Sequence, residues 1–295
     1  MKKTRICELL GIQYPIIQGG MSLIASAELA AAVSNAGGLG IISPNASEPD
    51  WGKVAENLRS QIRKGKSLTD KPFGVNFPIH VLGQDRSLLD IAIEEGVPVV
   101  TTGAGSPALH TSYLQEHGVR VLHLVASVKH AKGAEKSGVD AVIAEGYESG
   151  GINSPDELTT FVLVPQVVDA VSIPVIAAGG ICDARGLVAA LALGAEGVQM
   201  GTVFITTNEC TADQDYKDAI VAANDTATII TGRGSLPIRG LKSELITQGQ
   251  QMAEVDIAPR QMICGAVAGM INEILSAGDV VRNIVEGYDR IIAGL

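Results

Sequence analysis

The chain has 295 residues, a length that fits one large α/β barrel or two ordinary domains. Its net charge of −10, from 22 basic and 32 acidic residues, argues against nucleic acid or an anionic membrane as a partner. Aromatic residues make up only 3% of the chain, too few for a platform that stacks single-stranded bases, whereas 46% of the residues are hydrophobic. We therefore expect a large buried core and a small-molecule substrate.

Eight short β-rich segments recur along the chain, each followed by a stretch with helix signals. Several are continuous apolar runs, which is typical of parallel strands buried on both faces. Eight β-α units predict a (β/α)8 TIM barrel, and an open, doubly wound sheet of fewer strands is the alternative. The expected strands are Pro15–Gln18, Gly40–Ile42, Gly74–Phe77, Pro98–Thr101, Arg120–Leu124, Ala141–Ala144, Pro174–Ala177 and Gly197–Met200.

The segments between the strands carry helix-capping signals. Ser26–Gly37 and Asp183–Gly194 each begin with an N-cap residue and end with a glycine. Residues 203–260 are too long for one barrel helix, so we expect an insertion over the C-terminal face of the barrel. Residues 261–295 return to apolar periodicity and are expected to close the barrel. The prediction is one domain over residues 1–295.

The cysteines give no sign of a disulfide framework or a metal site. Cys7, Cys182, Cys210 and Cys264 are widely spaced and form neither a CxxC pair nor a zinc pattern. We interpret them as free thiols in a reducing cytoplasm. No run reaches the apolar length of a membrane span, and polar residues interrupt the N-terminal segment where a signal peptide needs an apolar run. The sequence thus predicts a cytoplasmic protein without a membrane partner.

Two glycine turns follow the last two predicted strands. Gly179-Gly180 ends the segment IPVIAAGG, and Gly201-Thr202 ends GVQMGT. Glycine lets the main chain approach a ligand closely, and the N–H groups of a following helix attract a phosphate. In a barrel these turns lie in the loops after strands seven and eight, where phosphate sites are common. Either pair alone is equally consistent with a tight βα turn, but the two together favour a phosphate site.

The motifs PIIQGGM, NAGGLGII, KPFGVNF, EGYESGG, IPVIAAGGICDARG and LGAEGVQMGTVF extend this pattern over the chain. With them the sequence resembles the nitronate monooxygenase superfamily, formerly called 2-nitropropane dioxygenases, which includes the flavin-containing type II enoyl-acyl carrier protein reductases. The resemblance implies a (β/α)8 barrel that binds FMN noncovalently, with NADH or NADPH as the electron donor in several members. It covers essentially the whole chain.

The resemblance also assigns cofactor contacts, position by position. It implies that the first-strand turn lies under the flavin, that Asn76 contacts the isoalloxazine, and that the loop after strand six and the two glycine turns border the cofactor. Asn76 as a turn cap and Gln166 as an ordinary helix-surface residue are the alternatives. Cys264 aligns with a segment near the flavin, where we expect a packing role. The implied cofactor residues are Gly19, Gly20, Met21, Asn76, Ser149, Gly150, Gly151, Gln166, Gly179, Gly180, Gly201 and Thr202.

One position departs from the family pattern. Many relatives carry Glu-x-Gly-Gly-His in the strand-six loop, with the histidine as the proposed proton-transfer residue, whereas this chain has Ile152 there. His123, at the end of strand five, and Glu148 are the candidate substitutes. The alternatives are an imidazole hydrogen-bonded in the barrel wall for His123 and a carboxylate that holds a loop for Glu148.

The sequence therefore predicts an FMN-dependent oxidoreductase that oxidises nitronates or a related small substrate through flavin N5. The alternatives are an NAD(P)H-dependent enoyl-thioester reductase or a quinone reductase. From other classes, we keep a phosphate-binding isomerase or aldolase, for which Lys129 and Glu145 are the candidates, and an inactive FMN-binding protein. A homodimer is compatible with the sequence.

Overall fold

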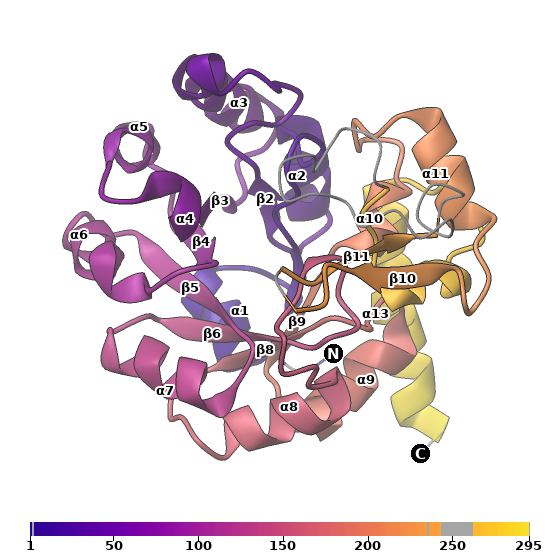
Figure 1. The fold of residues 1–295 in the computed structure, drawn as a ribbon. Helices are drawn as coiled ribbons and strands as arrows, with labels where there is room; N and C mark the ends of the chain where they lie inside the picture. The colour runs from indigo at the N-terminus through magenta and orange to yellow at the C-terminus, as the bar shows by residue number, and fades with distance from the viewer. Residues whose placement is uncertain (2, 235, 243–261, 295) are drawn as a thin grey trace.

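The computed structural model describes residues 1, 3–234, 236–242 and 262–294. Eight parallel strands form one sheet in the order β1-β9-β8-β6-β5-β4-β3-β2. A bridge between Ile17 and Leu39 joins the two ends, so the sheet closes into the barrel of Figure 1. The predicted TIM barrel is confirmed, and the open sheet is excluded. The barrel strands are β1 (Ile16–Gln18), β2 (Gly40–Ile42), β3 (Phe73–Pro78), β4 (Val99–Gly103), β5 (Arg120–Val125), β6 (Ala141–Glu145), β8 (Val175–Ala178) and β9 (Gly197–Met200).

Helices surround the strands on the outside (Figure 1). Their apolar faces form one core with the outward-facing strand residues, among them Val75, Val121 and Val198. The helices that follow the barrel strands are α2 (Ala27–Asn35), α3 (Val54–Leu68), α4 (Ile79–Leu82), α5 (Ser87–Glu94), α6 (Thr111–Glu116), α7 (Val128–Lys136), α8 (Thr160–Val168), α9 (Ala184–Ala192) and α10 (Thr202–Ile205). Short 3-10 turns, η1 (Trp51–Lys53) and η2 (Pro107–Leu109), precede α3 and α6.

The inward-facing strand residues form a second core inside the barrel. Leu122, Ile143 and Ile176 belong to it, and so do Ile6 and Leu10 of the N-terminal helix α1 (Arg5–Leu10). Helix α1 thus closes the end of the barrel at which the strands begin. In Figure 1 it lies within the ring of strands. The chemistry of the barrel is therefore confined to the opposite end, where catalytic residues of TIM barrels lie.

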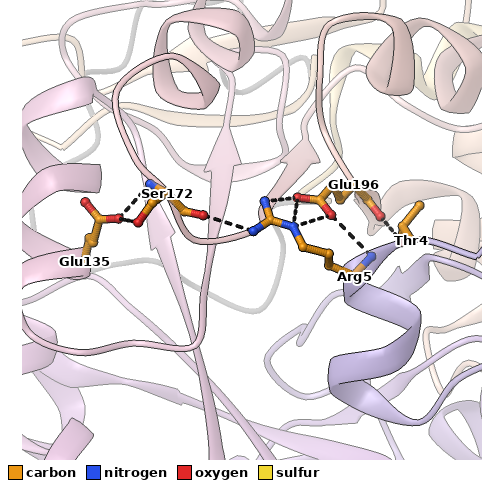
Figure 2. Close-up of polar contacts among 5 residues, drawn as sticks. All are labelled: Thr4, Arg5, Glu135, Ser172 and Glu196. Atoms are coloured by element: carbon orange, nitrogen blue, oxygen red, sulfur yellow. Dashed lines mark hydrogen bonds and ion pairs between the residues drawn. The ribbon is translucent and has the colours of Figure 1, made fainter.

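A polar network fastens α1 to the loops around it (Figure 2). The Arg5 guanidinium donates to both carboxylate oxygens of Glu196, each 2.9 Å from Nε, and to the Ser172 carbonyl at 3.0 Å. The Ser172 amide and hydroxyl donate to Glu135 at 2.7 and 2.6 Å. Thr4 Oγ1 donates to the Glu196 carbonyl at 2.6 Å. These bonds connect α1 with the last turn of α7 and with the loops before β8 and β9.

The segment after β9 builds a small sheet beside the mouth. β11 (Ile238–Leu241) pairs antiparallel with β10 (Thr228–Thr231) and with β7 (Gly151–Ile152), which lies in the loop after β6. Residues 235 and 243–260 of the predicted insertion lie outside the described residues. The remaining described elements are α11 (Gln214–Val221), η3 (Ala266–Met270) and α13 (Ala277–Gly294). Within the described ranges, no helix combines the length and the hydropathy needed to cross a membrane.

Candidate functional site

The mouth of the barrel is lined by a layer of inward-facing side chains at the strand ends. Side chains alternate along a strand, so residues two apart share a face. Val99 is an inner-core residue, which puts Thr101 on the same inner face. Val75 and Val198 belong to the outer core, so Asn76 and Gln199, next to them, face inward. We call Asn76, Thr101, Glu145, Ala178 and Gln199 the mouth layer.

The first-strand turn packs directly against this layer. A Cβ added at Gly20 would overlap Cβ of Asn76, and one added at Gly19 would lie 3.2 Å from Cδ of Gln199. Asn76 Oδ1 accepts a hydrogen bond from Thr101 Oγ1 at 2.9 Å. Glycine at positions 19 and 20 therefore lets the main chain lie flat on the amide side chains. The structure brings Asn76 together with this turn, as the resemblance implied.

The turn after β8 requires glycine at both positions. Gly179 and Gly180 have φ values of 84° and 71°, the left-handed region that side chains disfavour. A Cβ at Gly179 would also lie 2.7 Å from the Gly146 carbonyl oxygen. Within the described part of the chain, the Gly180 N–H group has no hydrogen-bond acceptor. The two glycines thus let this turn pack closely against the loop after β6, and the turn presents a main-chain donor.

The turn after β9 adds further donors. The N–H groups of Gly201 and Thr202 have no acceptor among the described residues. Thr202 Oγ1 is buried and accepts from Gly265 N at 2.9 Å, which leaves its own proton free to be donated. The first-strand turn reaches this point too, because Sδ of Met21 lies 3.7 Å from a Cβ added at Gly201. Three turns predicted as cofactor contacts therefore meet at the mouth.

One expectation about the phosphate site is wrong. The helix after Gly179-Gly180 was expected to offer unpaired N–H groups, but Asp183 caps it. The Asp183 carboxylate accepts from Arg185 N at 2.9 Å and from Gly186 N at 3.2 Å. The amides of Arg185 and Gly186 in the first turn of α9 are therefore already bonded, and the turn amides are the better donors for a ligand.

The loop after β6 is held from above by the segment 264–266. Ala266 N donates to the Glu148 carbonyl at 2.9 Å, and a Cβ at Gly150 would lie 2.6 Å from the carbonyl carbon of Cys264. Ser149 Oγ donates to Asn153 Oδ1 at 3.1 Å. Burial raises the pKa of the Cys264 thiol to about 12, which agrees with a packing role.

Glu148 holds the loop after β6, which was the expected alternative to a catalytic role. Its carboxylate accepts from the Thr160 amide at 3.1 and 2.9 Å, at the N-terminus of α8. The Thr160 hydroxyl lies 3.1 Å from the same carboxylate and 2.8 Å from the Gly179 carbonyl. Glu148 thereby links the β6 loop to the glycine turn after β8. Both of its carboxylate oxygens are bonded to Thr160, which agrees with a carboxylate that holds the loop.

His123 does not reach the mouth. Leu122 is an inner-core residue, so His123 faces the helices. Its side chain is 5% exposed, and Nδ1 lies 2.8 Å from Oγ1 of Thr102, another outward-facing residue. Burial lowers the pKa of His123 to about 4. His123 is thus the imidazole in the barrel wall that the alternative described.

Two further predicted residues lie away from the mouth layer. Gln166 is exposed on α8, where its amide donates to the Val162 carbonyl at 2.6 Å, as expected for a helix-surface residue. Ile152, at the position of the family histidine, is 43% exposed and pairs with Ile238 in the small sheet. The structure therefore does not bring Gln166 to the three turns.

The sequence considered Glu145 only for isomerase or aldolase chemistry, and it did not single out Thr101 or Gln199. Glu145 ends β6 in register with Ala178, which is in register with Gln199. Burial raises the pKa of Glu145 to about 7, although the side chain is partly exposed. The signal that identifies these residues is the alternation of each strand, counted from its buried inner residues.

Comparisons with known proteins place this geometry in a family. The family model described as nitronate monooxygenase matches residues 3–284. A probable nitronate monooxygenase of Staphylococcus saprophyticus is 38% identical over 288 residues, covering 82% of this chain and 79% of the relative. A (3aS,4S,5R,7aS)-5-hydroxy-7a-methyl-1-oxo-octahydro-1H-indene-4-carboxyl-CoA dehydrogenase of Rhodococcus jostii is 39% identical, covering 83% and 67%.

Solved structures agree with the family model. FabK of Thermotoga maritima superposes with a TM-score of 0.90 at 40% identity, covering 100% of this chain and 98% of that one. A nitroalkane oxidase of Streptomyces ansochromogenes superposes with a TM-score of 0.82 at 26% identity, covering 98% and 99%.

Proposed function

The chain belongs to the nitronate monooxygenase family of oxidoreductases, and from that premise we propose that it binds FMN at the barrel mouth and oxidises nitronates. The observation that carries the proposal is the set of amides at Gly180, Gly201 and Thr202, which have no acceptor among the residues that the structure describes. They lie in two turns that lack a blocking Cβ at their glycines, beside a buried hydroxyl. Such a set of donors suits a phosphate dianion.

The mouth layer suits the remainder of the cofactor. Asn76 and Gln199 carry amides that both donate and accept, as the polar edge of an isoalloxazine requires. Both lie against the first-strand turn, Asn76 at Gly20 and Gln199 at Gly19. FMN supplies the electron acceptor, and the protein orients it. A nitronate is already an anion, so its oxidation requires no base from the protein.

A second candidate function is the reduction of an enoyl thioester with NADH or NADPH as the donor. The match with FabK of Thermotoga maritima over the whole chain favours it. The relative from Rhodococcus jostii, whose name specifies a carboxyl-CoA compound, also points to thioester chemistry. Anaerobic mixing with NADH or NADPH separates the two candidates, because bleaching of the flavin is expected only where the nicotinamide is a donor.

The test of the proposed cofactor site compares two alanine variants. Gly180 and Gly11 both have positive φ, 71° and 67°, but nothing lies within 4 Å of a Cβ at Gly11. Both substitutions strain the backbone by about 1–2 kcal/mol, and only Gly180→Ala disturbs an amide of the phosphate site. Losing one hydrogen bond to a charged group costs about 1.5–3 kcal/mol, so FMN affinity is expected to fall about 10-fold or more in Gly180→Ala alone.

The measurement is FMN affinity by flavin fluorescence, followed by turnover of a preformed nitronate. Purified wild-type protein that shows no flavin absorbance and takes up no added FMN would refute the proposal. Equal FMN affinity in the Gly180→Ala and Gly11→Ala variants would refute the placement of the phosphate.

A further inference from the structure

Glu145 is the carboxyl group of the mouth layer. Ala141 and Ile143, two and four positions earlier on β6, are inner-core residues, so the alternation of the strand directs Glu145 inward. It is the last residue of β6, at the end of the barrel that α1 leaves open. Its neighbour in register on β8 is Ala178, a small side chain that stands between Glu145 and Gln199 in the sheet register. A titratable side chain thus borders the mouth.

The other ionisable groups around it are engaged elsewhere. On the loop that follows β6, Glu148 is bound to the Thr160 amide, and Tyr147 is covered by Arg239, whose guanidinium donates to the Tyr147 carbonyl at 3.2 and 3.0 Å. On β5, His123 faces the helices. The β8 and β9 neighbours, Ala178 and Gln199, carry no charge. Burial raises the pKa of the Glu145 carboxyl to about 7, against the opposing effect of a hydrogen bond with Ser149.

We propose that Glu145 is the catalytic base that lets this chain accept neutral nitroalkanes as well as nitronates, in the absence of the loop histidine. The inference rests on the proposed function. The carboxylate takes the proton from the α-carbon of the nitroalkane, and the electron pair of that C–H bond forms the C=N bond of the nitronate as charge moves onto the nitro oxygens. The step contains no oxidation. The protonated carboxyl then releases its proton to water.

The position explains why a carboxylate is suited to this step. A base acts best when its pKa lies close to the working pH, because it is then both ionised and basic. Burial raises the pKa of Glu145, so its carboxylate is a stronger base than that of a surface glutamate. Burial lowers the pKa of His123, so its imidazole is a weaker base than that of a surface histidine. Partial exposure leaves Glu145 accessible to a substrate at the mouth.

The experiment compares a neutral nitroalkane with its preformed nitronate in wild type, Glu145→Gln and Glu145→Asp. Loss of a general base costs about 100-fold or more. Glu145→Gln is therefore expected to lower the ratio of nitroalkane to nitronate turnover about 100-fold, and Glu145→Asp to restore part of it. His123→Ala is the control and keeps the wild-type ratio. If Glu145→Gln lowers both rates equally or changes neither, the proposal is overturned.

A second readout does not depend on electron transfer. In D2O without an electron acceptor, the wild-type protein is expected to exchange the α-protons of the nitroalkane for deuterium, as proton NMR measures, and Glu145→Gln is not. Exchange that is the same in both proteins overturns the proposal. A wild-type protein that exchanges protons but never oxidises nitronate would refute the proposed function while keeping the base. A protein that oxidises nitronate but neither turns over the nitroalkane nor exchanges its α-protons would refute the role of Glu145 as a base and keep the proposed function.

Discussion

Replacing Glu145 by Gln is expected to stabilise the folded protein, and to do so more as the pH rises. Burial raises the pKa of this carboxyl from 4.5 to about 7, so the fold disfavours its charged form. Between these values the folded chain binds more protons than the unfolded chain, and stability therefore falls as the pH increases. Gln is neutral throughout and removes this loss.

The size of the effect follows from the two pKa values. Each pKa unit corresponds to about 1.4 kcal/mol, so the charged carboxylate costs the wild-type fold about 3 kcal/mol once the pH exceeds 7. The variant is expected to be less than about 1 kcal/mol more stable than wild type at pH 5, and about 3 kcal/mol more stable at pH 8. Other titrating groups are common to both proteins and cancel in the difference.

Urea unfolding of both proteins at several pH values between 5 and 8 measures this difference directly. It reports on the environment of Glu145 whether or not FMN or a substrate is bound. A difference in unfolding free energy that stays constant over this range would refute the reasoning. It would mean that the carboxyl is fully hydrated at the mouth and unsuited to act as a base near neutrality.

Three further outcomes are expected. His123→Gln should show the opposite pH dependence. Burial lowers the pKa of His123 from 6.5 to about 4, so the contribution of the neutral imidazole to stability is complete above pH 6.5. As the pH falls from 7 to 4, wild type should lose up to about 3 kcal/mol of its stability advantage over the variant in the same urea assay. Gly20→Ala, whose Cβ would overlap Asn76, should lower the free energy of unfolding by about 1–3 kcal/mol and weaken FMN binding. Gly133→Ala in α7, where nothing lies within 4 Å of an added Cβ, should raise the free energy of unfolding by about 0.5–1 kcal/mol. Thermal unfolding and FMN titration distinguish the two variants. Arg5→Ala should lose about 1 kcal/mol, with less loss in high salt because the guanidinium is partly exposed; an equal loss at low and high salt would contradict an ionic origin.

The barrel was predictable from the sequence because its strands are continuous apolar runs separated by glycine-terminated helices. Each of the eight predicted strands overlaps an observed one, and the pattern of β2 and β9 is confirmed to the residue. The small sheet of β7, β10 and β11 was not predicted. β7 has two residues, one of them glycine, and its partners come from distant parts of the chain, so local periodicity carries no signal for it.

The site was predictable where glycine is required by close approach. Gly20, Gly179 and Gly180 are examples, since a side chain at each would meet the main chain or a neighbouring side chain. The orientation of His123 was not predictable, because the parity of a strand position decides whether a side chain faces the mouth or the helices. His123 and Glu145 both lie near strand ends, and only the inner-core neighbours in the folded barrel reveal which one faces inward. The assignment of FMN contacts, the homodimer and the cytoplasmic location stay predictions.

The closed end of the barrel has a consequence for the order of folding. Arg5 binds Glu196 and Ser172, which lie 191 and 167 residues further along the chain. Helix α1 is synthesised before β8 and β9, yet its docking site is complete only when these two strands have joined the sheet. Contacts of such long sequence separation form slowly, because the entropy of closing the loop must be overcome before they stabilise anything. Helix α1 is therefore among the last elements to reach its place, and until then Ile6 and Leu10 lack the inner-core neighbours that bury them in the folded barrel.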